Sequence, residues 1–237
     1  MKKLSVFFTV ILFILCIALS SCGNTPDVTS PAAPDGQTGE TTPENTPNGE
    51  KPLVSLLHNS VDVLSVGVYS GDFIENGKNE TAESTVFAAL KNNGEKALRL
   101  LEFEISDGET GYSFSVTSFL PGAELTVLEK NGKTAKNGLK AKSINITNVE
   151  FFDELPSTNE DIFSVSCAKN RLEVKNLSDT DISDGCIYLK RFSDGVYFGG
   201  ITYRIKTGEI KAGEAKTIEL SELDPSVCRV VFTTFDK

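Results

Sequence analysis

Apolar and polar residues alternate one by one in many short segments after residue 53. Phe103 and Ile105, for example, alternate with Glu102 and Glu104. A two-residue period places successive side chains on opposite faces of an extended chain, which is typical of a strand with one buried face. The pattern predicts an all-β fold, in which only residues 81–90 are compatible with a helix. The same alternation occurs at Phe114 and Val116, at Leu125 and Val127, and at Val230 and Phe232.

Dipeptides that favour reversal of the chain separate these segments. Glycine tolerates the positive φ angles that tight turns require, and a preceding Asp, Asn or Pro favours the turn itself. Their spacing suits a β-sandwich or a barrel. The dipeptides are Asp107-Gly108, Pro121-Gly122, Asn131-Gly132, Asp184-Gly185, Asp194-Gly195 and Ala212-Gly213.

The chain after residue 53 also repeats itself in the same order. Corresponding segments lie 84, 87 and 90 positions apart, with the glycines of the last pair, Gly122 and Gly213, 91 positions apart, a drift that small loop insertions explain. We expect two tandem β-modules, residues 53–155 and 156–237, with chance similarity between strand-rich segments as the alternative. The matched segments are Lys91-Asn92-Asn93-Gly94 with Lys175-Asn176-Leu177-Ser178, Asp107-Gly108 with Asp194-Gly195, and Pro121-Gly122-Ala123-Glu124 with Lys211-Ala212-Gly213-Glu214.

Three segments in the C-terminal part carry a resemblance to known proteins. They are Glu150-Phe151-Phe152-Asp153-Glu154-Leu155-Pro156-Ser157, Gly199-Gly200-Ile201-Thr202-Tyr203-Arg204 and Lys211-Ala212-Gly213-Glu214. Together they resemble a family of uncharacterised Firmicutes surface proteins. The resemblance implies an immunoglobulin-like fold in this half, and it supplies no activity and no catalytic residue. With the repeat, it leads us to expect two tandem small immunoglobulin-like β-sandwich modules after a disordered linker.

The amino terminus has the pattern of an export signal. Lys2 and Lys3 precede an apolar run over residues 4–19, which is too short for a comfortable membrane span of about 20 residues. The sequence Leu19-Ser20-Ser21-Cys22 resembles the lipobox of bacterial lipoproteins, in which the cysteine receives a diacylglyceryl group. We therefore expect residues 1–21 to be a signal peptide and Cys22 to be the lipid attachment site. An ordinary signal peptide with a chance cysteine is the alternative.

Residues 22–52 are rich in Thr, Pro, Gly, Asn and Glu and contain almost no apolar side chains. Such a segment cannot bury enough surface to offset the entropy lost on folding, so we expect a disordered acidic tether. Removing Lys2 and Lys3 with the signal peptide takes the net charge from −10 to −12. A chain this acidic repels phosphate backbones and anionic lipids, so we expect no nucleic-acid partner and attachment through lipid alone.

Cys16 leaves with the signal peptide and Cys22 takes the lipid, so that three cysteines remain: Cys167, Cys186 and Cys228. An odd number excludes a fully paired framework, but one bridge with one free thiol is compatible with an oxidising compartment. Cys228 alternates with Val230 and Phe232, so we expect it to face a core as a small apolar residue. The sequence has no CxxC spacing of the kind that indicates a thiolate zinc site.

Short motifs of penicillin-recognising serine enzymes occur in an unsuitable setting. Ser166-Cys167-Ala168-Lys169 is an SxxK sequence, and Lys206-Thr207-Gly208 is a KTG sequence. In those enzymes the serine of the SxxK sequence is the nucleophile and begins a helix, whereas Ser166 lies in a strand-like segment. Only 40 positions separate Ser166 from Lys206, too few for the helical domain that lies between the two motifs in those enzymes. His58 is the single histidine and precedes both repeats, and no pair of carboxylates stands out as a glycosidase pair. We expect no catalytic residue and no enzyme activity.

Two loops carry partial ligand-binding patterns. Asn131-Gly132-Lys133-Thr134 matches the end of a phosphate-binding loop, but Val127 stands where the first glycine belongs, so a hairpin turn is favoured. Three aspartates precede Gly185 as in a calcium loop, but Lys190 stands where a bidentate glutamate belongs. We expect a solvated turn without metal or cofactor, and a cation bound in the loop is the alternative. The aspartates are Asp179, Asp181 and Asp184.

Aromatic residues are concentrated in one part of the second half. Such rings can form a ligand-binding surface, and Gly199-Gly200 beside them allows a close backbone approach or a β-bulge. We hypothesise a binding surface that includes Tyr197, Phe198 and Tyr203, with burial of these rings in a core as the alternative. The concentrated rings are Tyr188, Phe192, Tyr197, Phe198 and Tyr203.

These expectations together describe a protein held by lipid on the extracytoplasmic face of the cell membrane. Because no catalytic centre is evident, we expect a non-catalytic display or protein-interaction module with an envelope protein as its partner. The alternatives are a glycan-binding protein, an accessory subunit of an envelope hydrolase and a pure spacer.

Overall fold

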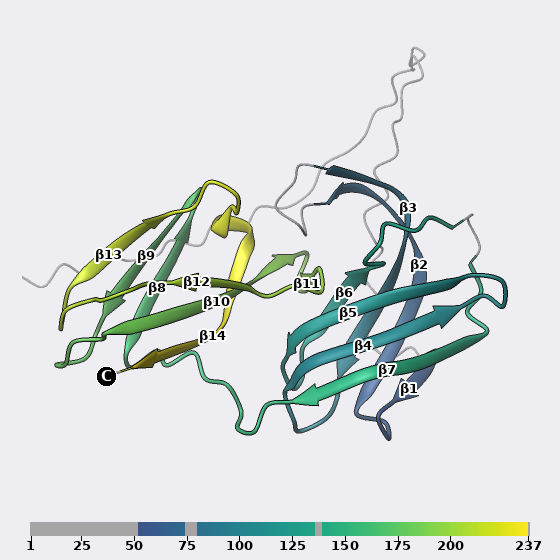
Figure 1. Cartoon of the computed structure of the whole chain (residues 1–237), viewed down its shortest axis with the longest axis horizontal. Helices are drawn as coiled ribbons and strands as arrows, with labels where there is room; N and C mark the ends of the chain where they lie inside the picture. Colours follow the sequence, from purple (N-terminus) through teal and green to yellow (C-terminus); the bar gives the residue numbers. More distant parts are fainter. Residues whose placement is uncertain (1–51, 74–79, 136–138, 237) are drawn as a thin grey trace, which may run out of the picture. The chain divides into compact units, whose positions relative to one another are not determined.

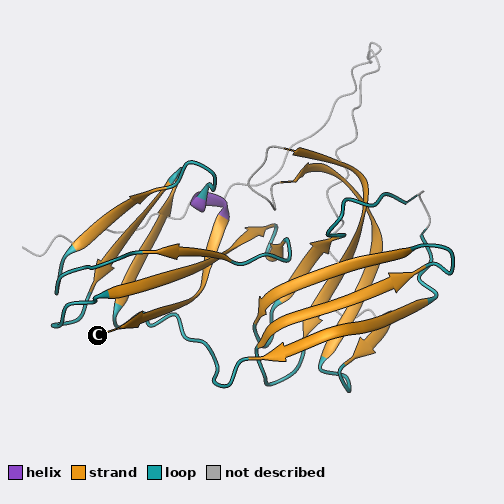
Figure 2. Cartoon of the chain, in the orientation of Figure 1, coloured by secondary structure: helices purple, strands orange, loops and turns teal. Residues whose placement is uncertain are grey.

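The computed structural model describes residues 52–73, 80–135 and 139–236 (Figure 1). These residues form β-strands, with a single short 3-10 helix, η1 (Pro225–Val227), among the described parts (Figure 2). The all-β prediction is therefore confirmed. Within the described ranges, no helix is long and apolar enough to cross a membrane.

The strands of the first half form two antiparallel sheets. In one, β3 lies between β2 and β6, and β1 extends the sheet beyond β2. In the other, β4 lies between β5 and β7. The strands are β1 (Val54–Leu56), β2 (Val61–Phe73), β3 (Glu80–Asn92), β4 (Leu98–Ser106), β5 (Gly111–Phe119), β6 (Glu124–Leu128) and β7 (Ser143–Phe151).

The strands of the second half pair in the same order. In one sheet β9 lies between β8 and β13, and in the other β10 lies between β12 and β14. β11 forms a hairpin with the end of β10. The strands are β8 (Phe163–Ala168), β9 (Arg171–Asn176), β10 (Asp184–Ser193), β11 (Val196–Phe198), β12 (Tyr203–Lys206), β13 (Ala215–Glu219) and β14 (Cys228–Asp236).

Each half buries its own cluster of apolar side chains. In the first half, alternate residues from both sheets form the cluster, in which the stacked rings of Phe103 and Phe114 have centroids 4.9 Å apart. In the second half, residues of both sheets surround Leu172, Ile187 and Leu189, which are fully buried. Apolar side chains between two sheets are the main stabilising feature of a sandwich-like arrangement.

A buried asparagine fixes the end of the central strand in the first half. Asn92 ends β3 and is completely buried. Its Nδ2 donates to the carbonyl oxygens of Lys96 at 3.1 Å and Phe119 at 2.9 Å. Its Oδ1 accepts from the backbone N–H of Gly94 at 3.0 Å. The amide therefore joins the end of β3 to the backbone of the following turn and to the end of β5.

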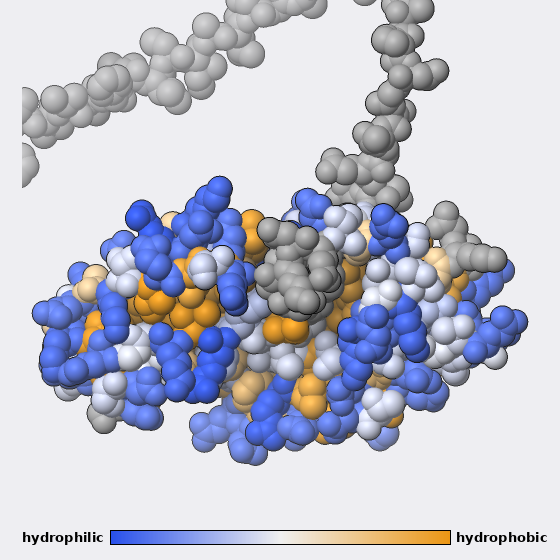
Figure 3. Space-filling view, turned by 45° about the horizontal axis from the view of Figure 1, so that its top comes forward, coloured by the Kyte–Doolittle hydropathy of each residue, from blue (hydrophilic) through white to orange (hydrophobic). Residues whose placement is uncertain are grey.

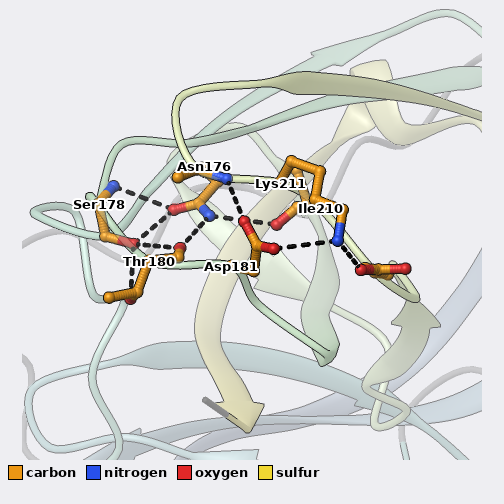
Figure 4. Close-up of polar contacts among 8 residues, drawn as sticks. Asn176, Ser178, Thr180, Asp181, Ile210 and Lys211 are labelled. Carbon is orange, nitrogen blue, oxygen red and sulfur yellow. Dashed lines mark hydrogen bonds and ion pairs between the residues drawn. The ribbon is translucent and has the colours of Figure 1, made fainter.

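Asn176 has the same contacts at the end of β9 (Figure 4). Its Nδ2 donates to the carbonyl oxygens of Thr180 at 2.8 Å and Ile210 at 3.2 Å. Its Oδ1 accepts from the backbone N–H of Ser178 at 3.0 Å. Like Asn92, it is completely buried.

The partners of these two asparagines also correspond along the sequence. Asn92 and Asn176 are 84 positions apart, and their distant carbonyl partners, Phe119 and Ile210, are 91 positions apart. The backbone N–H of Asn92 donates to Ala123, and that of Asn176 donates to Glu214, again 91 positions on. Both offsets are among those of the sequence repeat, so the repeated residues occupy equivalent hydrogen-bonded positions.

Two local predictions are wrong. Residues 81–90 lie in strand β3, because pairing with β2 and β6 on both sides outweighs a weak local preference for helix. Asp184-Gly185 begins β10 and does not form a turn. A side chain at Gly185 would meet Thr207 Oγ1 at 2.6 Å, so close packing explains this glycine.

A bulge also changes the face on which Phe232 lies. Leu189 pairs with Val230 but Tyr188 pairs with Phe232, so Val231 is the extra residue. An extra residue exchanges the two faces of a strand. Cys228 and Val230 therefore face the second core as predicted, whereas the ring of Phe232 lies on the opposite face, stacked on Tyr188 with centroids 4.0 Å apart.

The asparagine contacts give a prediction for stability. Asn176→Ala removes four hydrogen bonds of a buried side chain, including one from the Ser178 hydroxyl, and leaves a space, so we expect the free energy of unfolding to fall by about 1–3 kcal/mol. Urea unfolding followed by circular dichroism measures this change. Asp179→Asn, on the exposed part of the same loop, is the control and should change stability by less than about 0.5 kcal/mol. Equal stability of the two variants would contradict the structural role of Asn176.

Candidate functional site

Cys22, the predicted lipid attachment site, lies outside the described residues, as do the predicted signal peptide and nearly all of the predicted tether. The other three predicted site residues, Tyr197, Phe198 and Tyr203, lie in well-defined structure. They belong to, or directly follow, a segment that contacts both halves of the protein. We call residues 196–202 the joint segment.

The joint segment pairs with the first half through backbone hydrogen bonds. β11 runs parallel to β6, with Tyr197 opposite Leu125 and Phe198 opposite Thr126. The backbone N–H of Gly199 then donates to the carbonyl of Thr126 at 2.8 Å. Because β11 also pairs with β10, one continuous sheet crosses both halves, with its strands in the order β1, β2, β3, β6, β11, β10 and β12.

Gly200 makes the closest contact of the joint segment with β5. Its carbonyl accepts from the backbone N–H of Thr117 at 2.8 Å and from the Thr117 hydroxyl at 3.1 Å. A Cβ atom at position 200 would overlap the carbonyl oxygen of Ser115. Glycine is thus required here because two backbones come together, which explains one residue of the Gly199-Gly200 pair.

Thr117 and Thr202 add further hydrogen bonds between β5 and the joint segment. The backbone N–H of Thr202 donates to Thr117 Oγ1 at 2.9 Å, and the hydroxyl of Thr202 donates to the carbonyl of Thr117 at 3.1 Å. Threonine side chains that replace strand partners satisfy an edge strand that would otherwise expose its polar groups. The outer edge of β5 is closed at this point by the second half.

Lys190 holds the joint segment from the other side. Its side chain lies on β10 and is only 2% exposed, and its Nζ donates to the carbonyls of Gly200 at 2.9 Å and Ile201 at 3.2 Å. A buried ammonium group is tolerated only where it is hydrogen-bonded. Lys190, which the sequence suggested only as a mismatch in a calcium loop, therefore anchors the joint segment to β10.

The three predicted binding rings are packed against the protein. Phe198 is 8% exposed and forms a small cluster with Ala82 and Leu128, with the Tyr69 ring at 5.3 Å. Tyr197 is half-buried against the first core, and Tyr203 is half-buried against the second. Burial favours the alternative, a packing role, and these rings do not present an exposed aromatic surface.

The remaining rings of the aromatic stretch also have partners. Tyr188 stacks on Phe232, and Phe192 meets Tyr197 edge-on with centroids 5.4 Å apart. The guanidinium of Arg229 lies 3.4 Å from the centroid of Phe192, a cation–π geometry. Of these rings, Phe192 contacts the joint segment through Tyr197, whereas the Phe232 ring meets Phe152 edge-on with centroids 5.5 Å apart.

Apolar residues exposed at the surface are dispersed. Figure 3 shows one face, on which hydrophilic side chains predominate and apolar ones form limited groups. Scattered single apolar residues are normal on a protein surface and do not indicate a docking site. Among the described residues, the large exposed ones are Leu53, Phe151, Leu155, Leu177, Ile201 and Val227.

The aspartate loop is engaged in internal contacts (Figure 4). Asp181 accepts from the backbone N–H of Ala212 at 2.9 Å and pairs with Lys211 Nζ at 3.0 Å, and Lys211 also pairs with Glu209. The Ala212 N–H and then the Lys211 ammonium hold the pKa of the Asp181 carboxyl below its usual range. The described part of the chain contains no cluster of three metal-capable side chains, and Asp181 serves to join two loops.

The two enzyme-like motifs do not form a catalytic arrangement. Ser166 is exposed in the middle of strand β8 and does not begin a helix. Thr207 of the KTG sequence is 2% exposed, and its carbonyl accepts from Lys216 Nζ at 2.6 Å. His58 is exposed in the turn between β1 and β2, where its φ angle is positive.

Glu129 occupies the loop that resembles a phosphate-binding loop. Its carboxylate, on a residue that is 2% exposed, accepts from the backbone N–H groups of Asn131 and Lys133, both at 2.8 Å, and of Ser113 at 3.2 Å. The N–H groups that could bind an anion are thus already paired with the protein's own carboxylate. A turn is present here, with Gly132 at a φ of 68° and its N–H donating to the carbonyl of Glu129 at 3.2 Å. It is not the predicted hairpin, because β6 pairs with β3 and β11 whereas the next strand, β7, pairs with β4.

Sequence reasoning missed the residues on which these contacts depend: Thr117, Glu129 and Lys190. A buried charged residue has no periodic signature, because its position is fixed by groups distant in the sequence. The only local signal was the Gly199-Gly200 pair, which indicated a close backbone approach without identifying its partner.

Comparisons of the chain with protein families, with curated proteins and with solved structures find no match.

The joint segment gives a second prediction. Gly200→Ala places a methyl group against Ser115 and should lower the free energy of unfolding by about 2–3 kcal/mol, the cost of overpacking a close contact. Urea unfolding monitored by tyrosine fluorescence measures this loss.

Gly195→Ala is the matched control in the same hairpin. Gly195 has a φ of 90° and open space around its Cβ position, so only backbone strain of about 1–2 kcal/mol applies. A Gly200→Ala variant as stable as the wild type would show that the two backbones do not meet in solution.

Proposed function

We propose that this protein is a lipid-anchored, non-catalytic display or protein-interaction protein on the extracytoplasmic face of the cell membrane. The anchor is the diacylglyceryl group on Cys22, and residues 22–52 form the tether. The folded part presents its surface to another envelope protein. The supporting sequence pattern is the apolar run followed by Leu19-Ser20-Ser21-Cys22.

We further propose that the folded part consists of two tandem immunoglobulin-like sandwiches. Six strands correspond between the halves: β2 to β7 in the first, and β8, β9, β10, β12, β13 and β14 in the second. In each set, the second and fifth strands pair in one sheet (β3 with β6, β9 with β13). The third and sixth strands pair in the other (β4 with β7, β10 with β14). Pairing of the second strand with the fifth and of the third with the sixth is typical of immunoglobulin-like sandwiches. The equivalent contacts of Asn92 and Asn176 support the same view.

The main structural support for a display function is that the joint segment couples the two halves. Hydrogen bonds from β5 and β6 to residues 199–202 couple the two halves through backbone atoms, which a loose linker between independent domains would not do. Coupled halves present their surfaces together as one unit. The aromatic rings that a sugar-stacking platform would use are packed in this contact, which makes a glycan-binding function the weaker alternative.

The anchor is tested with Cys22→Ser in the native host. We expect the variant to lose incorporation of radiolabelled palmitate and to move from the membrane fraction to the soluble fraction, because several acyl chains supply the attachment. A protease added to intact cells should degrade the anchored wild-type protein, as expected for an extracytoplasmic location.

Cys16→Ser is the control for the anchor. Cys16 lies six positions earlier in the apolar run, and its replacement should leave labelling and sedimentation unchanged. Palmitate labelling or membrane retention of Cys22→Ser would overturn the proposed anchor.

A further inference from the structure

Two cysteines face the core of the second half from opposite sheets. Cys167 lies on β8, at the edge of the sheet that contains β9 and β13, and Cys228 begins β14, at the edge of the sheet that contains β10 and β12. Cys228 belongs to the buried cluster, and Cys167 is half-buried and packs against it. Both thiols are free in this structure.

Contacts on both sides of the two cysteines place them next to each other. At one end, the rings of Phe163 on β8 and Phe235 on β14 meet edge-on with centroids 5.6 Å apart. At the other end, the backbone N–H of Leu220 donates to the carbonyl of Asn170 at 2.7 Å, and the backbone N–H of Asn170 donates to the carboxyl of Asp224.

Cys167 lies between Phe163 and Asn170, and Cys228 lies between Asp224 and Phe235. Both cysteines therefore lie between the same two contacts, Phe163 with Phe235 and Asn170 with Asp224, on segments that pass each other in the core. Cα atoms of β8 come within 8 Å of both η1 and β14, and η1 directly precedes Cys228. Cysteines joined by a disulfide have Cα atoms about 4–7 Å apart, a separation comparable to the spacing of these two segments.

The third cysteine faces away from this core. Cys186 lies on β10 next to Ile187, which points into the core, so the alternation of the strand directs the Cys186 side chain outward. Its Sγ accepts from Arg204 Nε at 3.2 Å on that outer face. Cys186 is therefore unsuited to bridge with either of the other two.

The pKa values of the two thiols agree with this placement, because Cys167 is close enough to affect Cys228. Burial raises the pKa of Cys167, and burial together with the neighbouring Cys167 raises the pKa of Cys228 to about 12. Thiolates are the reactive species, so few are available in the folded protein. Oxidation should accordingly occur while the chain folds or when the edge of the sandwich opens.

We propose that Cys167 and Cys228 form an intramolecular disulfide between β8 and β14, and that Cys186 remains a thiol. The oxidant is a small or protein disulfide. One cysteine thiolate attacks it, forming a mixed disulfide and releasing one thiol; the second thiolate then attacks the mixed disulfide and releases the other thiol. The protein loses two protons and two electrons, and the oxidant is reduced to two thiols. Such a bridge would fasten the edges of the two sheets.

The test uses the full chain with Cys16→Ser and Cys22→Ser, so that only the three cysteines of the folded part remain. The protein is refolded from urea in a mixture of reduced and oxidised glutathione, alkylated, and digested without reduction. Mass spectrometry should find the Cys167 peptide linked to the Cys228 peptide, with Cys186 alkylated. A linkage that includes Cys186, or alkylation of all three cysteines, would overturn the proposal.

Unfolding measurements add a second readout with matched variants. The oxidised chain should unfold at a higher urea midpoint than the same chain kept in reductant. Cys186→Ala should retain this difference, whereas Cys167→Ala should abolish it. A difference that persists in Cys167→Ala would also contradict the assignment.

Discussion

The two halves of this protein depend on each other through the contact of the Gly200 backbone with β5. There, the carbonyl of Gly200 accepts from Thr117, and the absence of a side chain lets the two backbones approach. On one side of this contact β11 adds to β6, and on the other the buried ammonium of Lys190 holds the same carbonyl. An edge strand that is paired in this way is protected from pairing with other chains. The contact thus both orients the halves and closes an edge that would otherwise be exposed.

Much of the fold could be predicted from local patterns. The alternation around Phe103 and Phe114 identified strands with one buried face, and the Asp194-Gly195 pair identified a hairpin in which both residues have positive φ angles. The repeat offsets of 84 and 91 positions coincide with the equivalent contacts of Asn92 and Asn176. The predictions of the strands and of this hairpin succeeded because each depends on neighbouring residues alone.

Other features could not be predicted, because they depend on partners distant in the sequence. Residues 81–90 form a strand because they pair with β2 and β6. The side chain of Phe232 lies on the face opposite to the predicted one because of a β-bulge at Val231, which has no local sequence signal. The aromatic residues between 188 and 203 have the composition of a binding surface, yet Phe198 is buried by residues of the first half. Composition alone does not distinguish a ring that binds a ligand from one that packs in an internal contact. The buried charges of Glu129 and Lys190 are likewise explained only by the carbonyl and N–H groups around them.

Amide hydrogen exchange of the native chain, measured by NMR, tests the coupling of the two halves most directly. If the joint segment is hydrogen-bonded to β5 and β6, the amides of Thr117, Gly199 and Thr202 exchange as slowly as those of the paired strands β2 and β3. The amide of Gly195, in the exposed hairpin turn, provides the reference for rapid exchange. Rapid exchange of all three joint amides, with both cores still protected, would show that the halves are independent and would contradict this account.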